Sequence, residues 1–168
     1  MKAILILIAS FVLFSCKAQQ TSVKQPEAPY KQFPTVPETL ELTKPDNSTF
    51  VKAQLKKQQT LIMYFSPDCE HCIKQMDEMI PRMNQFKKIQ ILLATNQPME
   101  ELVKFIAKYK LSDYPNVVAG RDAKFNLPGF FRMQSLPYFA LYDKSGKLIT
   151  TFESNTKVEK ILKAFKKS

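Results

Sequence analysis

Two continuous apolar runs stand out in the pattern of hydrophobic and polar positions along the chain. Residues 60–65 and 89–94 carry almost only apolar side chains, which is typical of strands buried on both faces of a sheet. Shorter apolar stretches predict three more strands, at 116–119, 138–142 and 147–152. A turn at 143–146 joins the last two strands, so we expect them to form a hairpin.

Apolar residues at helical spacing predict helices between and after these strands. The predicted helices cover 69–80, with Pro81 kinking the helix or starting a second piece that ends near Phe86, then 98–109, a broken segment at 123–133, and 156–167. Asn47 or Ser48 is expected to cap an earlier helix that carries Phe50 and Leu55. Strands that alternate with helices, followed by a hairpin and a last helix, predict an α/β sandwich.

Residues 1–15 have the pattern of a bacterial export signal. Met1 and Lys2 form a short positive start, and residues 4–14 are almost wholly apolar. As a helix this apolar stretch would be only about 16 Å long, whereas a hydrocarbon core is about 30 Å thick. We therefore expect a removable signal peptide and no permanent transmembrane helix.

The residues Leu13-Phe14-Ser15-Cys16 resemble the lipobox of bacterial lipoproteins, in which the signal peptide is cut before a cysteine that carries diacylglycerol. The alternative is ordinary cleavage after Ala18, which would discard Cys16. Each buried methylene of a lipid contributes about 0.8 kcal/mol, so two or three acyl chains would anchor the protein stably. The favoured prediction is lipidation at Cys16, with the domain on the periplasmic, extracytoplasmic side of a membrane.

Residues 16–45 are rich in Pro, Gln and Lys and are expected to form a semi-extended tether, although residues 33–42 could pack on the edge of the domain. The domain itself is expected to cover residues 46–168. The formal net charge of the whole chain is +10, from lysines that are scattered or lie along helix faces. Because no aromatic residues are interleaved for base stacking, this charge indicates a solvated surface near anionic lipid and no nucleic-acid partner.

Cys69 and Cys72 are three residues apart at the expected start of a helix that follows a buried strand. Side chains at positions i and i+3 share a helix face, so the two sulfurs can reach disulfide geometry. The helix N-terminus offers free amide donors and a positive dipole end, which favour the thiolate form of Cys69. Cys69 is therefore a candidate nucleophile for thiol–disulfide exchange, and Cys72 is its candidate resolving thiol.

Two alternatives to redox chemistry apply to this cysteine pair. A structural disulfide closing four residues would stabilise the fold by only roughly 2 kcal/mol in the loop-entropy model, against about 3 kcal/mol for fifteen residues. A zinc site needs four ligands, whereas the chain after Cys16 offers two cysteines and one histidine. We favour redox chemistry and expect neither a metal nor another cofactor.

The neighbours of the cysteines are expected to tune their reactivity. Asp68 and Glu70 place negative charge near Cys69 and disfavour its thiolate form. His71, as a cation or as a hydrogen-bonding group, favours the thiolate. The sequence leaves open which effect dominates. The alternative for His71 is an ordinary exposed residue that does not affect the cysteines.

The stretches 61–72 and 135–147 resemble the motif strand and the cis-proline loop, strand and turn of the thioredoxin superfamily. The likeness is strongest to its exported, membrane-tethered disulfide-reductase (TlpA-like) branch and spans about residues 40–166. It implies a thioredoxin-like three-layer sandwich with a central mixed sheet. It also implies a cis peptide bond before Pro137, beside the Cys69 sulfur, and a Leu136 backbone available to pair with a substrate strand.

Three positions depart from the pattern of that family. The aromatic residue that usually precedes the first cysteine is replaced by Asp68. The buried acid six residues before that cysteine is Met63, and the glutamate often found three residues after the second cysteine is Gln75. The usual proton acceptors for the resolving thiol are thus missing, so Glu70, Asp68 or water would have to serve.

These observations predict a thiol–disulfide oxidoreductase that acts on cell-envelope proteins and is kept reduced by an upstream membrane partner. A peroxiredoxin-like peroxidase is one alternative: Ser66 fits its motif, but Ile62 stands where a proline is expected. A copper-delivery module is another, although such modules use a wider cysteine spacing and a distant histidine. The third alternative is a non-catalytic binding domain that keeps the cysteines.

Overall fold

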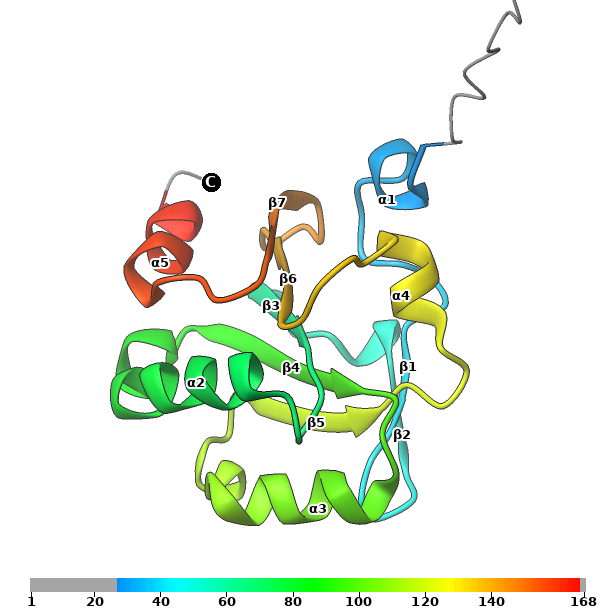
Figure 1. The fold of residues 1–168 in the computed structure, drawn as a ribbon. Helices are drawn as coiled ribbons and strands as arrows, with labels where there is room; N and C mark the ends of the chain where they lie inside the picture. Colours follow the sequence, from blue (N-terminus) through cyan, green and yellow to red (C-terminus); the bar gives the residue numbers. More distant parts are fainter. Residues whose placement is uncertain (1–26, 167–168) are drawn as a thin grey trace, which may run out of the picture.

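A seven-stranded mixed sheet runs through the computed structural model, which describes residues 27–166 (Figure 1). The strand order across the sheet is β2-β1-β5-β4-β3-β6-β7. The strands are β1 (Glu41–Thr43), β2 (Thr49–Val51), β3 (Gln59–Tyr64), β4 (Ile89–Thr95), β5 (Val117–Arg121), β6 (Tyr138–Tyr142) and β7 (Leu148–Glu153). Strands β3, β4 and β5 are parallel neighbours, whereas the pairs β3–β6, β6–β7, β1–β5 and β1–β2 are antiparallel.

Helices cover both faces of this sheet and create two apolar clusters. Along β3, Leu61 and Met63 belong to one cluster and Ile62 and Tyr64 to the other, because successive strand residues point to opposite faces. The helices of the first face are α2 (Glu70–Met79), α3 (Met99–Lys108) and α5 (Val158–Lys166); those of the second are α1 (Pro29–Gln32) and α4 (Asn126–Phe131). The 3-10 helices are η1 (Lys52–Gln54), η2 (Ile80–Phe86) and η3 (Leu111–Asp113).

The predicted three-layer α/β sandwich with a central mixed sheet is confirmed. The two continuous apolar runs are β3 and β4, the central strands, and each has helices over both faces. The predicted kink at Pro81 is present as the change from α2 to η2, because proline has no N–H for an α-helical hydrogen bond. The hairpin turn is also confirmed, with Gly146 at φ +80°, a conformation that glycine adopts without strain.

The helix predicted after Asn47 or Ser48 is wrong. Residues Thr49–Val51 form β2, which pairs antiparallel with β1 and places Phe50 opposite Leu42. Phe50 is buried while its two neighbours are exposed, which is the alternation of a strand. The Asp46 carboxylate accepts hydrogen bonds from the Ser48 N–H (2.9 Å) and hydroxyl (2.6 Å), and this turn directs the chain back along β1.

The domain boundary expected at residue 46 falls inside the sheet. Strand β1 lies within the predicted tether, and Val36, Leu40 and Leu42 of the same stretch are buried in the second apolar cluster. At Gly120, in β5, an added Cβ would lie only 2.7 Å from the Leu42 Cβ. The end of the predicted tether is therefore part of the fold, and β5 admits it closely because it carries a glycine there.

The predicted signal peptide at residues 1–15 and the lipidation site at Cys16 lie outside the described residues. From residue 27 to residue 166, no helix is long and apolar enough to cross a membrane.

Candidate functional site

Cys69 occupies the N-cap position of α2. Its backbone is extended, with φ −78° and ψ 117°, and its carbonyl accepts a hydrogen bond from the Ile73 N–H at 2.9 Å. The Cys69 N–H donates to the Ser66 carbonyl at 3.2 Å, which closes the turn between β3 and α2. The side chain is partly exposed. Its sulfur is therefore accessible at the positive end of the helix dipole.

Cys72 lies one turn further along α2 and is fully buried, with 0 % of its surface exposed. Burial raises the pKa of the Cys72 thiol to about 12. A hydrogen bond from the Ser66 backbone lowers this pKa, whereas a hydrogen bond with the Cys69 side chain and the charges of Cys69 and Asp68 raise it. Both thiols are free. The two cysteines are therefore in contact but unequal, with one accessible sulfur and one buried, protonated thiol.

The Leu136–Pro137 peptide bond is cis, as the sequence resemblance implied. Pro137 is buried and directly precedes β6, whose first residue, Tyr138, pairs with Tyr64 at the end of β3. The chain leaves β3 at Tyr64 and reaches Cys69 five residues later. The proline loop and the cysteine motif therefore meet at the same end of the two central strands.

His71 is held by Asn155, a residue that sequence reasoning missed. The Asn155 Nδ2 group donates to the His71 carbonyl at 2.6 Å, and Asn155 Oδ1 lies 3.0 Å from His71 Nδ1. Because the amide nitrogen faces a carbonyl, the amide oxygen must face the ring, so Nδ1 carries the hydrogen. In the neutral ring Nε2 then keeps its lone pair. His71 is thus a fixed side chain with one free basic nitrogen.

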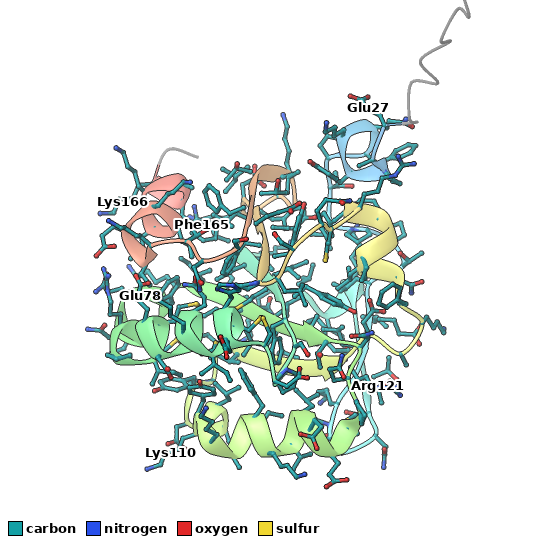
Figure 2. The ribbon with its side chains drawn as sticks, viewed as in Figure 1. Glu27, Glu78, Lys110, Arg121, Phe165 and Lys166 are labelled. Atoms are coloured by element: carbon teal, nitrogen blue, oxygen red, sulfur yellow. The ribbon has the colours of Figure 1, made fainter. Side chains whose placement is uncertain are left out.

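The contact between α2 and the start of α5 continues along the helix. Gln75, fully buried, donates from Nε2 to the Thr156 carbonyl (3.0 Å), and its Oε1 accepts the Thr156 N–H (2.8 Å). Glu78, which is labelled in Figure 2, accepts the Val158 N–H at Oε1 (2.9 Å), and Arg82 forms an ion pair with Glu159. We call this contact the polar seam: His71, Gln75, Glu78 and Arg82 on one side, residues 155–159 on the other.

The sequence contains a signal for the polar seam. Gln75 lies between Cys72, Met76 and Met79, which are all core positions of α2. A polar residue in an apolar helix face needs a buried hydrogen-bond partner, and the repeat of polar residues at 71, 75, 78 and 82 follows one helix stripe. The identity of the partner could not be read from this pattern, because residues 155–159 are more than seventy positions away.

The two positions at which the thioredoxin superfamily often has an acid, 63 and 75, carry no acid here, and the acids nearest to the motif are Asp68 and Glu70. Met63 is fully buried among apolar side chains, and both polar groups of the Gln75 side chain are already hydrogen-bonded. Asp68 is exposed, and a hydrogen bond from the Ser66 hydroxyl and one from its own backbone N–H lower its pKa. Glu70 is exposed in the first turn of α2. Neither position 63 nor position 75 can accept a proton from Cys72.

Within residues 27–166, no group of three or more His, Cys, Asp or Glu side chains is placed to hold a metal ion. The groups near the cysteine motif include two thiols, an imidazole, the exposed carboxylates of Asp68 and Glu70 and the backbone beside a cis proline.

Comparisons with known proteins agree with this arrangement. A thioredoxin-like domain family matches residues 47–167. DsbF of Mycobacterium tuberculosis, solved in mixed oxidised and reduced forms, is 14% identical with a TM-score of 0.65, over 77% of this chain and 96% of that chain. A secreted disulfide oxidoreductase of the same organism, homologous to DsbE of E. coli, is 15% identical with a TM-score of 0.60, over 74% and 92%.

The exposed lipoprotein thioredoxin of Streptococcus pneumoniae is 21% identical with a TM-score of 0.61, over 77% of this chain and 98% of that chain. No curated protein sequence matches the chain. At these identities the solved structures show a shared fold, and the match to the domain family covers most of the described residues. The chain therefore belongs to the thioredoxin-like domain family.

Proposed function

We propose that this protein is a thiol–disulfide oxidoreductase of the cell envelope, with Cys69 as the nucleophile and Cys72 as the resolving thiol. The observation that carries the proposal is the inequality of the two cysteines. Cys69 is accessible at the N-terminus of α2, while Cys72 is buried against it with a pKa raised to about 12. This arrangement supports attack by one sulfur followed by release through the other.

The reaction transfers two electrons from the dithiol to a substrate disulfide. The Cys69 thiolate attacks one substrate sulfur, a mixed disulfide forms, and the other substrate sulfur leaves as a thiolate that takes up a proton. Cys72 then loses its proton and attacks the Cys69 sulfur, which releases the second substrate thiolate. The protein ends as the Cys69–Cys72 disulfide, so an upstream dithiol partner in the membrane must reduce it again.

Cys72 needs a proton acceptor in the second step, because burial holds its thiol in the neutral form. His71 is one candidate, since Asn155 binds the Nδ1 side of the ring and the neutral ring keeps a lone pair on Nε2. Asp68, whose charge acts on the Cys72 thiol, Glu70 and solvent water are the other candidates. One of these groups would thus take the role for which positions 63 and 75 offer no acid.

Substrate binding would use the loop before β6. The family resemblance implies that the Leu136 backbone pairs with an extended substrate segment beside the cysteine motif. The substrates would be thiols and disulfides of other cell-envelope proteins. A lipid on Cys16 would hold the domain at a membrane on its extracytoplasmic side, as the lipobox-like residues 13–16 indicate.

Reduction of insulin by dithiothreitol tests the reaction. The wild-type chain should accelerate it, and Cys69→Ser and Cys72→Ser should each remove the acceleration. Val103→Ser, which introduces the same residue, serine, at an exposed position of α3, is the matched control and should keep full activity. An inactive wild type that binds copper tightly, or one that consumes peroxide, would replace the proposal with metal delivery or peroxidase activity.

Capture of substrates tests the cellular role. A full chain with Cys72→Ser should retain envelope proteins as mixed disulfides through Cys69, and a chain that also carries Cys69→Ser should retain none. Partition of the chain into detergent should be lost with Cys16→Ala. Partition that survives this substitution would contradict the lipid anchor without affecting the redox proposal.

A further inference from the structure

The end of the sheet remote from Cys69 carries a concentration of lysines. Strands β3 and β4 begin there, β6 and β7 meet there in the hairpin turn, and α5 ends there, where Gln59 donates to the Phe165 carbonyl. These elements bring together exposed lysines from four separate segments of the chain. We call this set the lysine pole; it consists of Lys56, Lys57, Lys87, Lys88, Lys144, Lys147 and Lys166.

Two hollows adjoin the lysine pole, one on each face of the sheet at the start of β3. The larger, about 710 Å³, lies between Lys87, Lys88 and Lys166, with Ile89, Leu162 and Phe165 among its lining residues. The smaller, about 190 Å³, is lined by Lys56, Lys57 and Lys144. The first hollow touches Gln59 and the second touches Gln58 and Thr60, so both adjoin the start of β3.

Asp143 is the one acid that lines either hollow, and the Lys147 charge helps to lower the pKa of its carboxyl. Six ion pairs occur between residues 27 and 166, and none includes a lysine of the pole. The Asp143 carboxylate binds backbone N–H groups of the hairpin turn, from Ser145 (2.8 Å) and Lys147 (3.0 Å). Seven like charges on one solvent-facing end create a positive potential that attracts an anionic partner.

Three acids lie near the cysteines at the opposite end. Asp68 and Glu70 flank Cys69, and Glu153, at the end of β7, accepts a hydrogen bond from Ser135 of the proline loop. In Figure 2, Lys166 and Lys110 lie at the left of the molecule and Arg121, at the end of β5, lies at the right. Strand β3 separates the ends by about 20 Å, more than a Debye length of about 8 Å, so the two charge sets act separately.

The N-terminal segment reaches the domain at the lysine pole. Thr35 forms a bridge with Lys147, the Pro34 carbonyl accepts the Leu148 N–H (2.7 Å), and the Val36 N–H donates to the Gly146 carbonyl (3.1 Å). Ten residues lie between Cys16 and Glu27, where the described chain begins. Fully extended, these eleven residue steps span at most about 40 Å, so a membrane that holds Cys16 can reach the lysine pole.

We propose that the lysine pole binds the anionic headgroups of the membrane to which the protein is anchored, so that Cys69 faces away from the lipid. The inference rests on the proposed anchor at Cys16 for its high local concentration. Lysines near an anionic surface each add to the attraction, and the acids around Cys69 are repelled by the same surface. The membrane thereby orients the site toward soluble envelope proteins.

Lysine acetylation of the lipidated full chain in vesicles tests this orientation. In vesicles with roughly one third phosphatidylglycerol, the lysines of the pole should be acetylated at least about fivefold more slowly than in phosphatidylcholine vesicles. Lys104 and Lys124, which are paired with acids elsewhere on the surface, should react equally in both. Salt at about 1 M, where the Debye length is about 3 Å, should remove the protection.

Charge reversal distinguishes an effect of the lysine pole from an effect of the net charge of the protein. A chain with Lys57→Glu, Lys87→Glu and Lys88→Glu should lose the protection of Lys144 and Lys166, yet reduce insulin as fast as the wild type in detergent. The matched triple change at Lys74, Lys104 and Lys124 alters the net charge equally and should leave the protection intact.

Three results would overturn the proposal or locate the failure. Equal acetylation in both kinds of vesicle, in a chain that floats with the vesicles, rejects the docking surface while leaving the anchor intact. A chain that does not float rejects the anchor. Protection by added heparin on phosphatidylcholine vesicles, without protection by phosphatidylglycerol, would make an acidic polymer the partner and reject lipid binding.

Discussion

Polar groups in the first turn of α2 are exposed to solvent, whereas Gln75, on the side of α2 that faces α5, is buried and hydrogen-bonded. In the first turn, Cys69 and Glu70 are exposed or half-exposed, and the accessible sulfur lies at an open helix end. On the side of the polar seam, Gln75 is fully buried and every polar group of its side chain is paired with the Thr156 backbone.

The difference shows how a reactive helix end can be both open and fixed. Exposed polar groups gain little from pairing because water competes, whereas buried groups must be paired or the fold loses stability. The polar seam therefore fixes α2 against α5 from the buried side. Cys69 can stay accessible because its helix is held elsewhere, and no buried acid is needed beneath the motif for this purpose.

Removal of the open sulfur should have the largest effect. Cys69→Ala deletes the only accessible thiol among the described residues, so insulin reduction should fall by at least about 100-fold. The free energy of unfolding should change little, because the side chain is only partly buried. A stopped insulin assay and urea unfolding measure the two quantities. Full activity in Cys69→Ala would mean that Cys69 is not the nucleophile.

Removal of the buried Gln75 side chain should have the next largest effect, on the free energy of unfolding instead of on the redox reaction. Gln75→Ala leaves the Thr156 N–H and carbonyl buried without their partner, at a cost of about 2–4 kcal/mol in the free energy of unfolding. Gln32→Ala, at an exposed glutamine of α1, is the control and should stay within about 0.5 kcal/mol of the wild type. Urea unfolding of the reduced proteins distinguishes them, and equal midpoints would mean that the polar seam does not hold α2.

Alkaline pH should weaken the reduced fold through Cys72. Its pKa is raised from 9.0 to about 12 by burial, so between these values the folded state keeps a proton that the unfolded state has lost. The stability contribution is therefore complete below pH 9 and decreases by up to about 1.4 kcal/mol per pH unit until about pH 12.

Cys72→Ala isolates this contribution from the buried tyrosines, whose raised pKa values act in the same direction. Urea unfolding at pH 8 and pH 10 should show a steeper decrease in the wild type than in Cys72→Ala. Parallel decreases would mean that the Cys72 thiol is not the group responsible.

The position of the cysteines at the start of α2 could be predicted from the sequence, whereas the buried contact between α2 and residues 155–159 could not. Apolar periodicity located β3, α2 and the two cysteines at the start of the helix, because burial patterns are local in the chain. Asn155 and Thr156 escaped prediction because they contact α2 across about eighty residues and stand in no periodic pattern. Contacts of this kind depend on how the last helix docks, which one sequence does not encode locally.

The wrong helix after Asn47 has a related cause. Phe50 and Leu55 fit helical spacing, but only Phe50 is buried, whereas Leu55 is half-buried. The strand partner of Phe50, β1, comes from a stretch that composition marked as a tether. Residues 33–42 were expected at most to pack on the edge of the domain, whereas Leu40 and Leu42 are core residues of the second cluster. Local pattern favoured a helix, and tertiary pairing with β1 overrode it.

The exposed end of the polar seam should show the smallest effect, on the tautomer of His71. Free imidazole prefers hydrogen on Nε2, but Asn155 Oδ1 at 3.0 Å from Nδ1 requires hydrogen on Nδ1. In Asn155→Ala the ring should revert to the Nε2–H form, and Nε2 would no longer accept a proton in the neutral state.

Nitrogen-15 chemical shifts of the single histidine report the tautomer directly. Insulin reduction should slow by about two- to fivefold in Asn155→Ala, since water and the neighbouring carboxylates can replace one base among several. Asn84→Ala, at an exposed asparagine of η2, should alter neither the shifts nor the rate. A changed tautomer with an unchanged rate would show that Asn155 positions His71 without any part in proton transfer, and the role of acceptor would then pass to Asp68, Glu70 or water.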